Sequence, residues 1–387
     1  MNDAIATRID RWQRRAWIAA ALGIGACFVA LFFAKPRVFQ AYWVAWIFWS
    51  GVSFGSLVIL MLHALTGGAW GAAARAPAEA GAMTLLLVAL LFVPALFGLG
   101  DIFPWMHSAA FAGHDWPHKR AYLTAPWFAV RGIGYFVPLI ALTMLLGLWA
   151  DRFPARWRFQ NPPANAAAIG AGGLVAYAAL MLFASTDWIV SMEPQWYSTM
   201  FVVIFAADHF LAALAFAVAV STRLASASEP AAVLAAKPLH DLGNLLLAFV
   251  IFWAYVTFSQ FLIIWSGNLP REISWYLHRS AGGWPRVTIA LVLVQFAVPF
   301  ALLLARAAKR HQSVLGSIAA LIFMANAVHV WWLVAPSFQT SGVRFPFLEL
   351  AALAGVGGVW IAVFLGFLKN RPVLRSTASS QSEVAHA

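Results

Sequence analysis

An acid and an imidazole stand side by side inside an apolar stretch of this chain. The segment FAADHFLAALAF, residues 205–216, has ten apolar residues around Asp208 and His209. An ionised carboxylate at the centre of a bilayer costs roughly 2.5–3.5 kcal/mol, so a membrane helix keeps one only where it is paired or functional. Asp and His side chains both exchange protons near neutral pH once their surroundings shift their pKa values. The pair therefore predicts a proton-relay station.

Asp208 needs a partner, and Arg131 is the cation that stands inside another predicted span. We expect the two to form an ion pair across their helices. A purely structural pair and a relay carboxylate with a cationic neighbour both remain open. Adjacent side chains diverge by about 100° around a helix, so His209 should face a different neighbour, the helix at 241–266 or at 312–334.

Further polar residues lie in or near the ends of the predicted spans. With Asp208, His209 and Arg131, the proton-relay candidates are Asp187, Asp241, Asn244, Asn326, His329 and Glu349. Asn326 and His329 are three residues apart and so share one helix face. Asp241 and Asn244 predict a cytoplasmic mouth, and Asp187, His329 and Glu349 predict a branched exit on the other side.

We expect this chain to bind no metal or haem of its own. Two histidines that ligate haem b must lie at one depth, and the intramembrane histidines do not. His114 and His118 have a spacing suited to zinc on a helix, but Pro117 argues against a helix there. Cys27 is the one cysteine, which excludes a haem c attachment motif and an iron–sulfur ligand set.

The composition identifies the solvent of these residues. The chain has 387 residues, of which 63% are hydrophobic and 10% are charged, against about 25% charged in soluble domains. An all-α polytopic membrane protein follows. Ten stretches are long enough to span a bilayer: residues 16–34, 40–64, 80–100, 124–149, 164–187, 198–221, 241–266, 285–305, 312–334 and 346–368.

The short loops between these stretches predict one transmembrane domain, residues 16–368, and not several. Residues 1–15 form a cytoplasmic N-terminal segment, and the small polar residues of 369–387 indicate a disordered cytoplasmic tail. We expect the first apolar run to stay in the protein as a helix, because it is longer than a signal peptide's core.

The positive charges predict the orientation. If the N-terminus is cytoplasmic, 16 of the 25 Lys and Arg residues fall on the cytoplasmic side, 8 fall outside, and Arg131 lies within a span. This bias places both termini inside. It also explains the net charge of +11 without nucleic acid as a partner.

The outer loops 101–125 and 267–284 are rich in Trp, His and Arg. Anchoring of aromatic side chains at the lipid interface explains many of them. Loops of this length and composition also suit a docking surface, since Trp, Tyr and Arg are typical interface anchors.

Three stretches carry a resemblance to a known family: HKRAYLTAPWFAVR (118–131), TDWIVSMEPQWYSTMF (186–201) and FWAYVTFSQFLIIWSGNLPREISWY (252–276). They resemble the ActF-type membrane subunit of alternative complex III, a bacterial quinol:cytochrome c or quinol:oxidase oxidoreductase. This NrfD-like group includes the membrane subunit of polysulfide reductase. The resemblance implies ten helices, with four-helix bundles from helices two to five and six to nine and with helices one and ten flanking them.

The resemblance also implies partners and a place. It implies a second NrfD-like subunit, an iron–sulfur and molybdopterin-like subunit, and a multihaem cytochrome that carry the iron–sulfur clusters and haem c. The setting is the bacterial inner membrane, with its lipid and its quinol pool.

Three functions remain open. The leading one is a subunit that offers a proton-conducting polar route and a docking face without a redox centre. The second is a quinol or quinone site of the chain's own, formed by Arg131, Asp187 and His329. The third is an independent secondary transporter, for which Pro138 and Pro299 inside predicted spans are weak indications.

Overall fold

The structure is a computed structural model that describes residues 3–68, 70–107, 116–152, 164–226 and 236–369. These residues form helices and connecting loops, without a strand in any of the five ranges. The fold is therefore an all-α polytopic membrane protein. The C-terminal tail predicted from 369 onward lies outside the described residues after Lys369.

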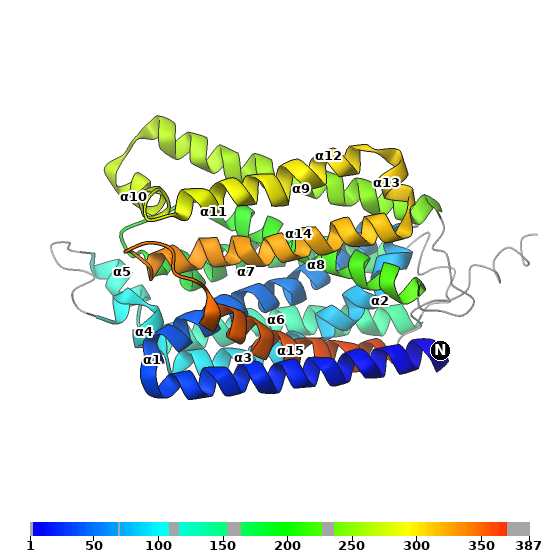
Figure 1. The fold of residues 1–387 in the computed structure, drawn as a ribbon, viewed down its shortest axis with the longest axis horizontal. Coiled ribbons are helices and arrows are strands. Elements are labelled where there is room, and N and C mark those ends of the chain that lie inside the picture. Colours follow the sequence, from blue (N-terminus) through cyan, green and yellow to red (C-terminus); the bar gives the residue numbers. More distant parts are fainter. Residues whose placement is uncertain (1–2, 69, 108–115, 153–163, 227–235, 370–387) are drawn as a thin grey trace, which may run out of the picture.

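The first helix, α1 (Asp3–Thr66), contains two membrane crossings. Its 64 residues would extend for about 96 Å, three times the thickness of a bilayer's apolar core. It bends at Ala34, where φ is −147° and ψ is 44°, two residues before Pro36. Proline lacks the amide donor and clashes with the preceding turn. Figure 1 shows the first half running along the bottom of the molecule before the chain turns back.

Two other crossings are built from shorter pieces. α2 (Trp70–Met83) and α3 (Leu85–Leu96) meet at a bend of 41°. This crossing begins ten residues before the predicted 80–100. α11 (Trp284–Leu291) and α12 (Val298–Leu304) are joined by a π-helical turn, η4 (Val292–Ala297). Neither the bend nor the π-turn was predicted from the sequence.

The remaining crossings are single helices: α6 (Ala125–Arg152), α7 (Ala164–Trp188), α8 (Phe201–Ala225), α9 (Ala236–Gly267), α14 (Gln312–Val334) and α15 (Phe347–Lys369). Within the described ranges, eight helices are long and apolar enough to span a membrane, and the bent pair makes a ninth. Since α1 folds back on itself, the number of crossings agrees with the ten predicted spans.

Short helices sit between the crossings at the two ends of the molecule. α4 (Leu99–Ile102), α5 (Pro117–Tyr122) and α10 (Pro270–Arg279) lie at one end, which we call the α10 end. α13 (Arg306–Arg310) lies at the other, the α13 end, where the chain also begins (Figure 1).

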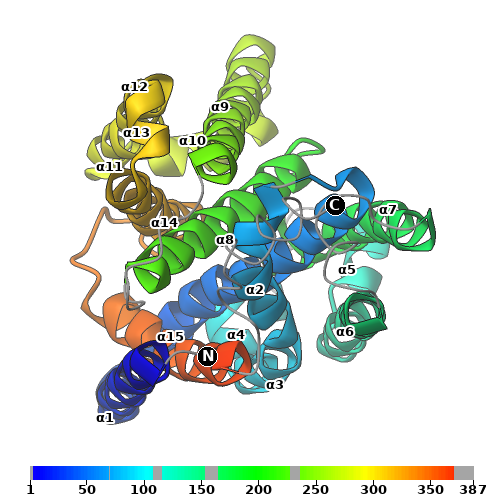
Figure 2. The same cartoon turned by 90° about the vertical axis from the view of Figure 1, so that its right-hand side faces the viewer.

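The crossings form two four-helix bundles (Figure 2). The first contains the second half of α1, α2–α3, α6 and α7. The second contains α8, α9, α11–α12 and α14. The first half of α1 packs on α15 beside them, with backbones so close that a Cβ at Gly23 would lie 2.4 Å from the Ala351 carbonyl oxygen.

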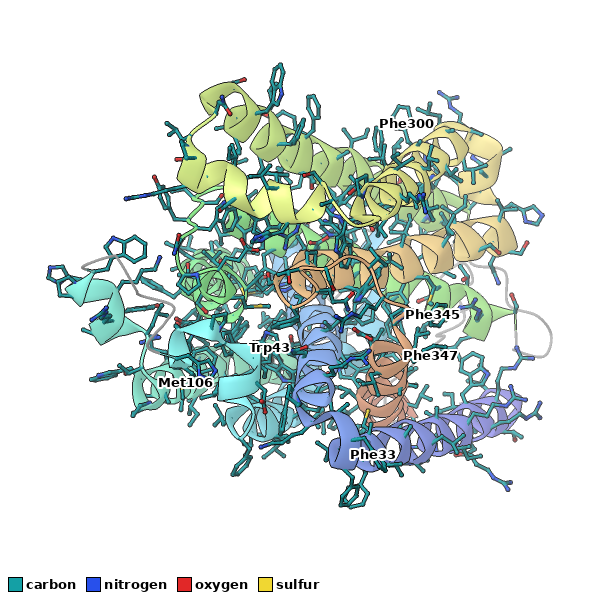
Figure 3. The ribbon with its side chains drawn as sticks, turned by 60° about the vertical axis from the view of Figure 1, so that its left-hand side comes forward. Phe33, Trp43, Met106, Phe300, Phe345 and Phe347 are labelled. Atoms are coloured by element: carbon teal, nitrogen blue, oxygen red, sulfur yellow. The ribbon has the colours of Figure 1, made fainter. Side chains whose placement is uncertain are left out.

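The surface of the spans is apolar, as lipid contact requires. Phe33 is 86% exposed and Phe347 is 72% exposed, whereas Trp43 is fully buried. Figure 3 shows Phe33 projecting away from the bundles and Trp43 within them.

Candidate functional site

Asp208 is the centre of a buried polar cluster in the second bundle. Its Oδ1 accepts hydrogen bonds from His329 Nδ1 at 2.9 Å and from Asn326 Nδ2 at 3.0 Å. Asp208 and His329 are each 1% exposed. α8 presents the carboxylate to α14, where Asn326 and His329 share a face as predicted. Asp208 is thus both buried and paired, as the cost of a carboxylate inside a bilayer requires.

Tryptophan side chains enclose the histidine of this cluster. The Trp253 ring meets the His329 ring edge-on at 5.0 Å, and the Trp332 ring stacks on it at 5.7 Å. Asp208 Oδ2 and His329 Nε2 are buried and have no hydrogen-bond partner in the described part of the chain. Asp208 and His329 thus each have one open polar atom, that is, one without a hydrogen-bond partner among the described residues. Proton exchange with a third group requires such an atom.

The predicted pairing of Arg131 with Asp208 is wrong. Arg131 Nε and Nη2 instead donate to the two carboxylate oxygens of Asp187, at 2.8 and 2.9 Å. The Tyr135 hydroxyl adds a third bond to Asp187 at 2.6 Å. α6 packs on α7, and these helices bring the pair together near the α10 end. Arg131 and Asp187 therefore form a bidentate ion pair inside the first bundle.

His209 faces away from Asp208, as neighbouring helix positions require, but toward other helices than predicted. Its Nδ1 is 2.8 Å from the Tyr177 hydroxyl of α7. Its ring and backbone lie against Gly51 and Gly55 of α1, where an added Cβ would approach His209 atoms to 2.7 and 1.8 Å. Glycines four apart allow this close approach of two membrane helices. His209 therefore lies in the seam between the bundles.

Asp241 and Asn244 lie near the α13 end, as predicted for a mouth. Lys309 Nζ donates to Asn244 Oδ1 at 2.7 Å, and His240 contacts both Asn244 and Asp241. Nine residues, or about 14 Å of helix, separate Asn244 from Trp253. The buried α9 positions between them are apolar, Leu246 and Val250 among them. The predicted continuous polar route is interrupted here by an apolar layer.

Glu349 also stands apart from Asp208. Its Oε1 accepts from Gln339 Nε2 at 3.2 Å near the α10 end, where α15 begins. The three quinone candidates are likewise divided. Arg131 and Asp187 bind each other in the first bundle, whereas His329 binds Asp208 in the second. The structure does not bring these three side chains into one site.

The segment TDWIVSMEPQWYSTMF passes from one bundle to the other at the α10 end. Glu193 Oε1 accepts from Ser337 Oγ at 3.0 Å and lies 3.4 Å from Arg279 Nη1. Trp196 donates to the Glu272 carbonyl at 3.0 Å, and Ser198 donates to Gln260 Oε1 at 2.9 Å. Its polar residues thus bind both α10 and the second bundle.

Arg279 is buried in this region and is 3% exposed. It caps α14 by donating to the carbonyls of Trp332 and Leu333, and its guanidinium lies 3.4 Å from the centre of the Trp275 ring. Burial lowers its pKa to about 10, so Arg279 stays charged at neutral pH. Sequence reasoning placed this arginine on a docking surface, and its burial corrects that placement.

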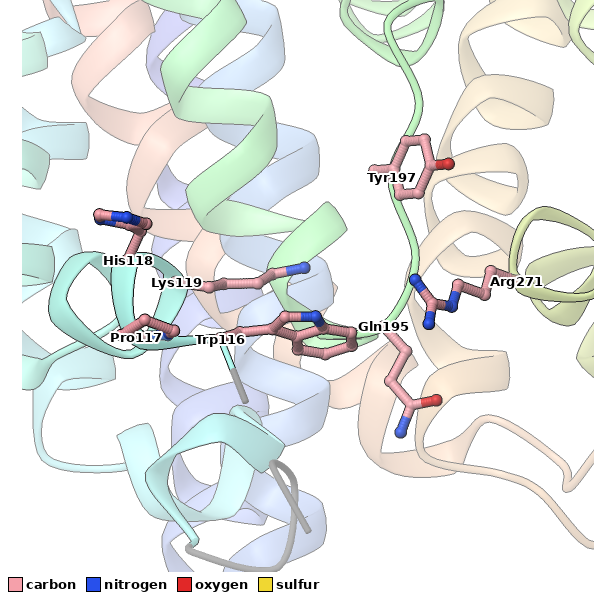
Figure 4. Close-up of a pocket in the computed structure, with 7 residues that line it drawn as sticks. All are labelled: Trp116, Pro117, His118, Lys119, Gln195, Tyr197 and Arg271. Carbon is pink, nitrogen blue, oxygen red and sulfur yellow. The ribbon is translucent and has the colours of Figure 1, made fainter. Parts of the chain in front are cut away.

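A pocket of about 340 Å³ opens at the α10 end between α5 and α10 (Figure 4). Trp116, Lys119, Tyr197 and Arg271 line it, with Pro117, His118 and Gln195. Lys119 reaches the Pro194 carbonyl, and burial lowers the pKa of its ammonium. The cationic and aromatic lining suits an anionic group. His114, named with His118 as a zinc candidate, lies outside the described residues.

Several of these partners were not singled out from the sequence. Tyr135 and Tyr177 look like ordinary aromatic residues in apolar runs. Gln295, in contrast, is a polar side chain within the predicted span 285–305, and a search for polar residues inside the spans could have found it.

Compared with known proteins, the chain matches no family model and no curated protein.

Proposed function

We propose that this chain is a membrane subunit of a quinol-oxidising respiratory complex of the bacterial inner membrane. In this proposal the α13 end faces the cytoplasm, and the redox centres belong to partner subunits docked at the α10 end. The resemblance of the three sequence stretches supplies the complex, its haem c and iron–sulfur partners and the quinol pool. The geometry around Asp208 supports the task that we assign to the chain itself, which is to conduct protons.

The observation that carries the proton function is the buried Asp208–His329 pair. A carboxylate and an imidazole joined through one atom each can take up and release a proton at their open atoms. Arg131, the cation expected beside Asp208, binds Asp187 instead. A proton that passes from Asp208 to the α13 end must cross the apolar layer at Leu246 and Val250, so this layer must be transiently hydrated. In the resting protein the dry layer prevents a proton leak.

Replacement of Asp208 by Asn tests this function in the assembled complex. The amide keeps the size and the hydrogen bonds of the side chain but cannot ionise. We expect turnover and quinol-coupled proton release to fall about 100-fold or more, since a positioned proton-transfer group typically contributes about 10²–10⁴-fold. Glu79→Gln is the control, because this carboxylate pairs with Arg75 in the first bundle. Wild-type proton release by Asp208→Asn in an intact complex would exclude the relay.

Docking at the α10 end is the second part of the proposal. The pocket offers Lys119 and Arg271 beside Trp116 and Tyr197, the residue types that anchor protein interfaces. Charge reversal by Lys119→Glu with Arg271→Glu should loosen the partner subunits in detergent, most clearly at raised salt. Arg286→Glu is the control at an exposed arginine near the same end. Unchanged copurification of the double variant would contradict docking here.

A further inference from the structure

Gln295 is a fully buried amide for which the proton function above has no use. It sits in the π-helical turn η4 and is 0% exposed. Neither Oε1 nor Nε2 has a hydrogen-bond partner among the residues that the structure describes. Leaving a buried polar group unsatisfied costs about 1–3 kcal/mol. π-helical turns within α-helices also occur frequently at functional sites.

One hydrogen bond between neighbouring helices places Gln295 at the depth of the Asp208 cluster. Trp332 Nε1 donates to Thr288 Oγ1 at 3.0 Å, so these residues are level on antiparallel helices. Seven residues along each helix lead from Thr288 to Gln295 and from Trp332 to Ala325, which is beside Asn326.

Asp208 and Gln295 lie on helical segments that share two neighbours. α8 packs against α9 and α14, and η4 packs against the same two helices. Asp208 binds Asn326 and His329 of α14, one of these two shared neighbours. Buried polar side chains of α8, α14 and η4 therefore lie at similar depth among these four crossings.

Six buried polar atoms on these helices are open, which means that they have no hydrogen-bond partner among the described residues: Asp208 Oδ2, Trp253 Nε1, Thr257 Oγ1, Gln295 Oε1, Gln295 Nε2 and His329 Nε2. The indole and the amide nitrogen donate, the carboxylate and the amide oxygen accept, and the hydroxyl does both. Six separate desolvation costs in one bundle would be comparable with the whole stability of a domain. Internal water satisfies such groups, typically with about three hydrogen bonds for each molecule.

We propose that ordered water molecules bridge Gln295 to Asp208 and His329, and that Gln295 is the positioning residue that holds this water. The inference deepens the proposed proton function and rests on it for its purpose, because the water is the group that exchanges protons with the open atoms of the pair. The hydration itself follows from the burial and the open atoms alone.

Thermal unfolding of the chain in detergent tests the water bridge without any activity. An amide that is dry and unpartnered gains stability when Gln295→Met replaces it by an apolar side chain, whereas a water-bridged amide loses stability. We expect Gln295→Met to lower the melting temperature. We also expect its effect to be non-additive with that of Asp208→Asn, as holds for residues in one network.

Gln260→Met is the matched control, since Gln260 on α9 bonds directly to Ser198. It should lower the melting temperature and be additive with Asp208→Asn. A melting temperature raised by Gln295→Met, or additive effects of Gln295→Met and Asp208→Asn, would overturn the water bridge.

Proton release by the assembled complex separates the bridge from the proton function. Gln295→Met should lower proton release per turnover, and Gln295→Glu, which again holds water, should restore part of it. Thermal coupling together with wild-type proton release in Asp208→Asn would keep the bridge and exclude the relay. Additive melting together with impaired proton release in Asp208→Asn would keep the relay and exclude the bridge.

Discussion

At the scale of single residues, helix neighbourhood decides which charges pair. Arg131 lies six residues into α6 from the α10 end, and Asp208 lies seven residues into α8 from the same end. Their depths are therefore similar, and opposite charge alone would pair them. The sequence identified both residues as buried and polar. It could not show that α6 packs on α7 while α8 packs on α14, because helix order in a bundle is a long-range property.

The Arg131–Asp187 pair gives a prediction about stability. Arg131→Leu leaves the buried Asp187 carboxylate with Tyr135 as its remaining partner, and breaking a buried pair costs about 3–5 kcal/mol. Arg131→Lys should cost less but still destabilise, since an ammonium cannot make the two-pronged contact. Thermal unfolding in detergent measures both.

The double variant is the control for this prediction. Arg131→Leu with Asp187→Leu removes both charges, and replacement of a buried pair by apolar residues is often neutral. We expect the double variant to recover most of the lost stability. A double variant as unstable as Arg131→Leu would show that the ion pair is not the cause.

At the scale of elements, hydrophobic length predicted all ten crossings, because each must cover the apolar thickness of the bilayer. The internal breaks were harder. Pro36 marks the fold-back of α1, and the sequence gap between the first two spans agrees with it. The π-turn at Val292–Ala297 has no such marker, since its residues are apolar apart from Gln295 and include no proline or glycine. The shift of one residue that a π-turn introduces depends on packing and not on local composition.

The contact between α1 and α15 is testable by two glycines of the same helix. A Cβ at Gly23 would lie 2.4 Å from Ala351 O and Gly355 N, whereas Gly25 has nothing within 4 Å of an added Cβ. Gly23→Val must push the helices apart, with an overpacking cost of about 1–3 kcal/mol. Melting temperature in detergent should fall for Gly23→Val and stay near wild type for Gly25→Val. Equal effects would mean that helix propensity and not the helix contact is responsible.

At the scale of the whole molecule, the segment TDWIVSMEPQWYSTMF, one of the three stretches that carry the resemblance, joins the two bundles at the α10 end. Glu193 accepts from Ser337 after α14 and contacts His278 and Arg279 of α10. The sequence showed that this segment is distinctive, but not what it does. Its acid lies eighty-odd residues from its cationic partners, a separation that no local pattern reveals.

The contact of Glu193 with His278 and Arg279 predicts that the stability of the chain depends on pH. The hydrogen bond to Glu193 raises the pKa of His278. His278 therefore stabilises the folded chain fully below its unfolded pKa of about 6.5, and this contribution is lost as the pH rises through the raised folded value. Burial raises the pKa of Glu193, but the His278 hydrogen bond and the Arg279 charge outweigh it and lower the pKa overall. The contribution of Glu193 is thus present above about pH 4.5 and is lost as the pH falls through its lowered folded pKa.

Both contributions are present together between about pH 4.5 and 6.5, so the contact should be strongest in that window. We expect His278→Gln to lower the melting temperature more at about pH 5.5, where the wild-type imidazole is protonated, than at about pH 8, because the imidazole loses its proton as the pH rises through its raised pKa. The side chain is 42% exposed, so the difference should be modest and should shrink with added salt. His311→Gln, at an exposed histidine near the α13 end, should leave the pH profile unchanged. If His278→Gln lowers stability equally at both pH values, the imidazole acts there as a neutral hydrogen-bond donor and the charge contributes nothing.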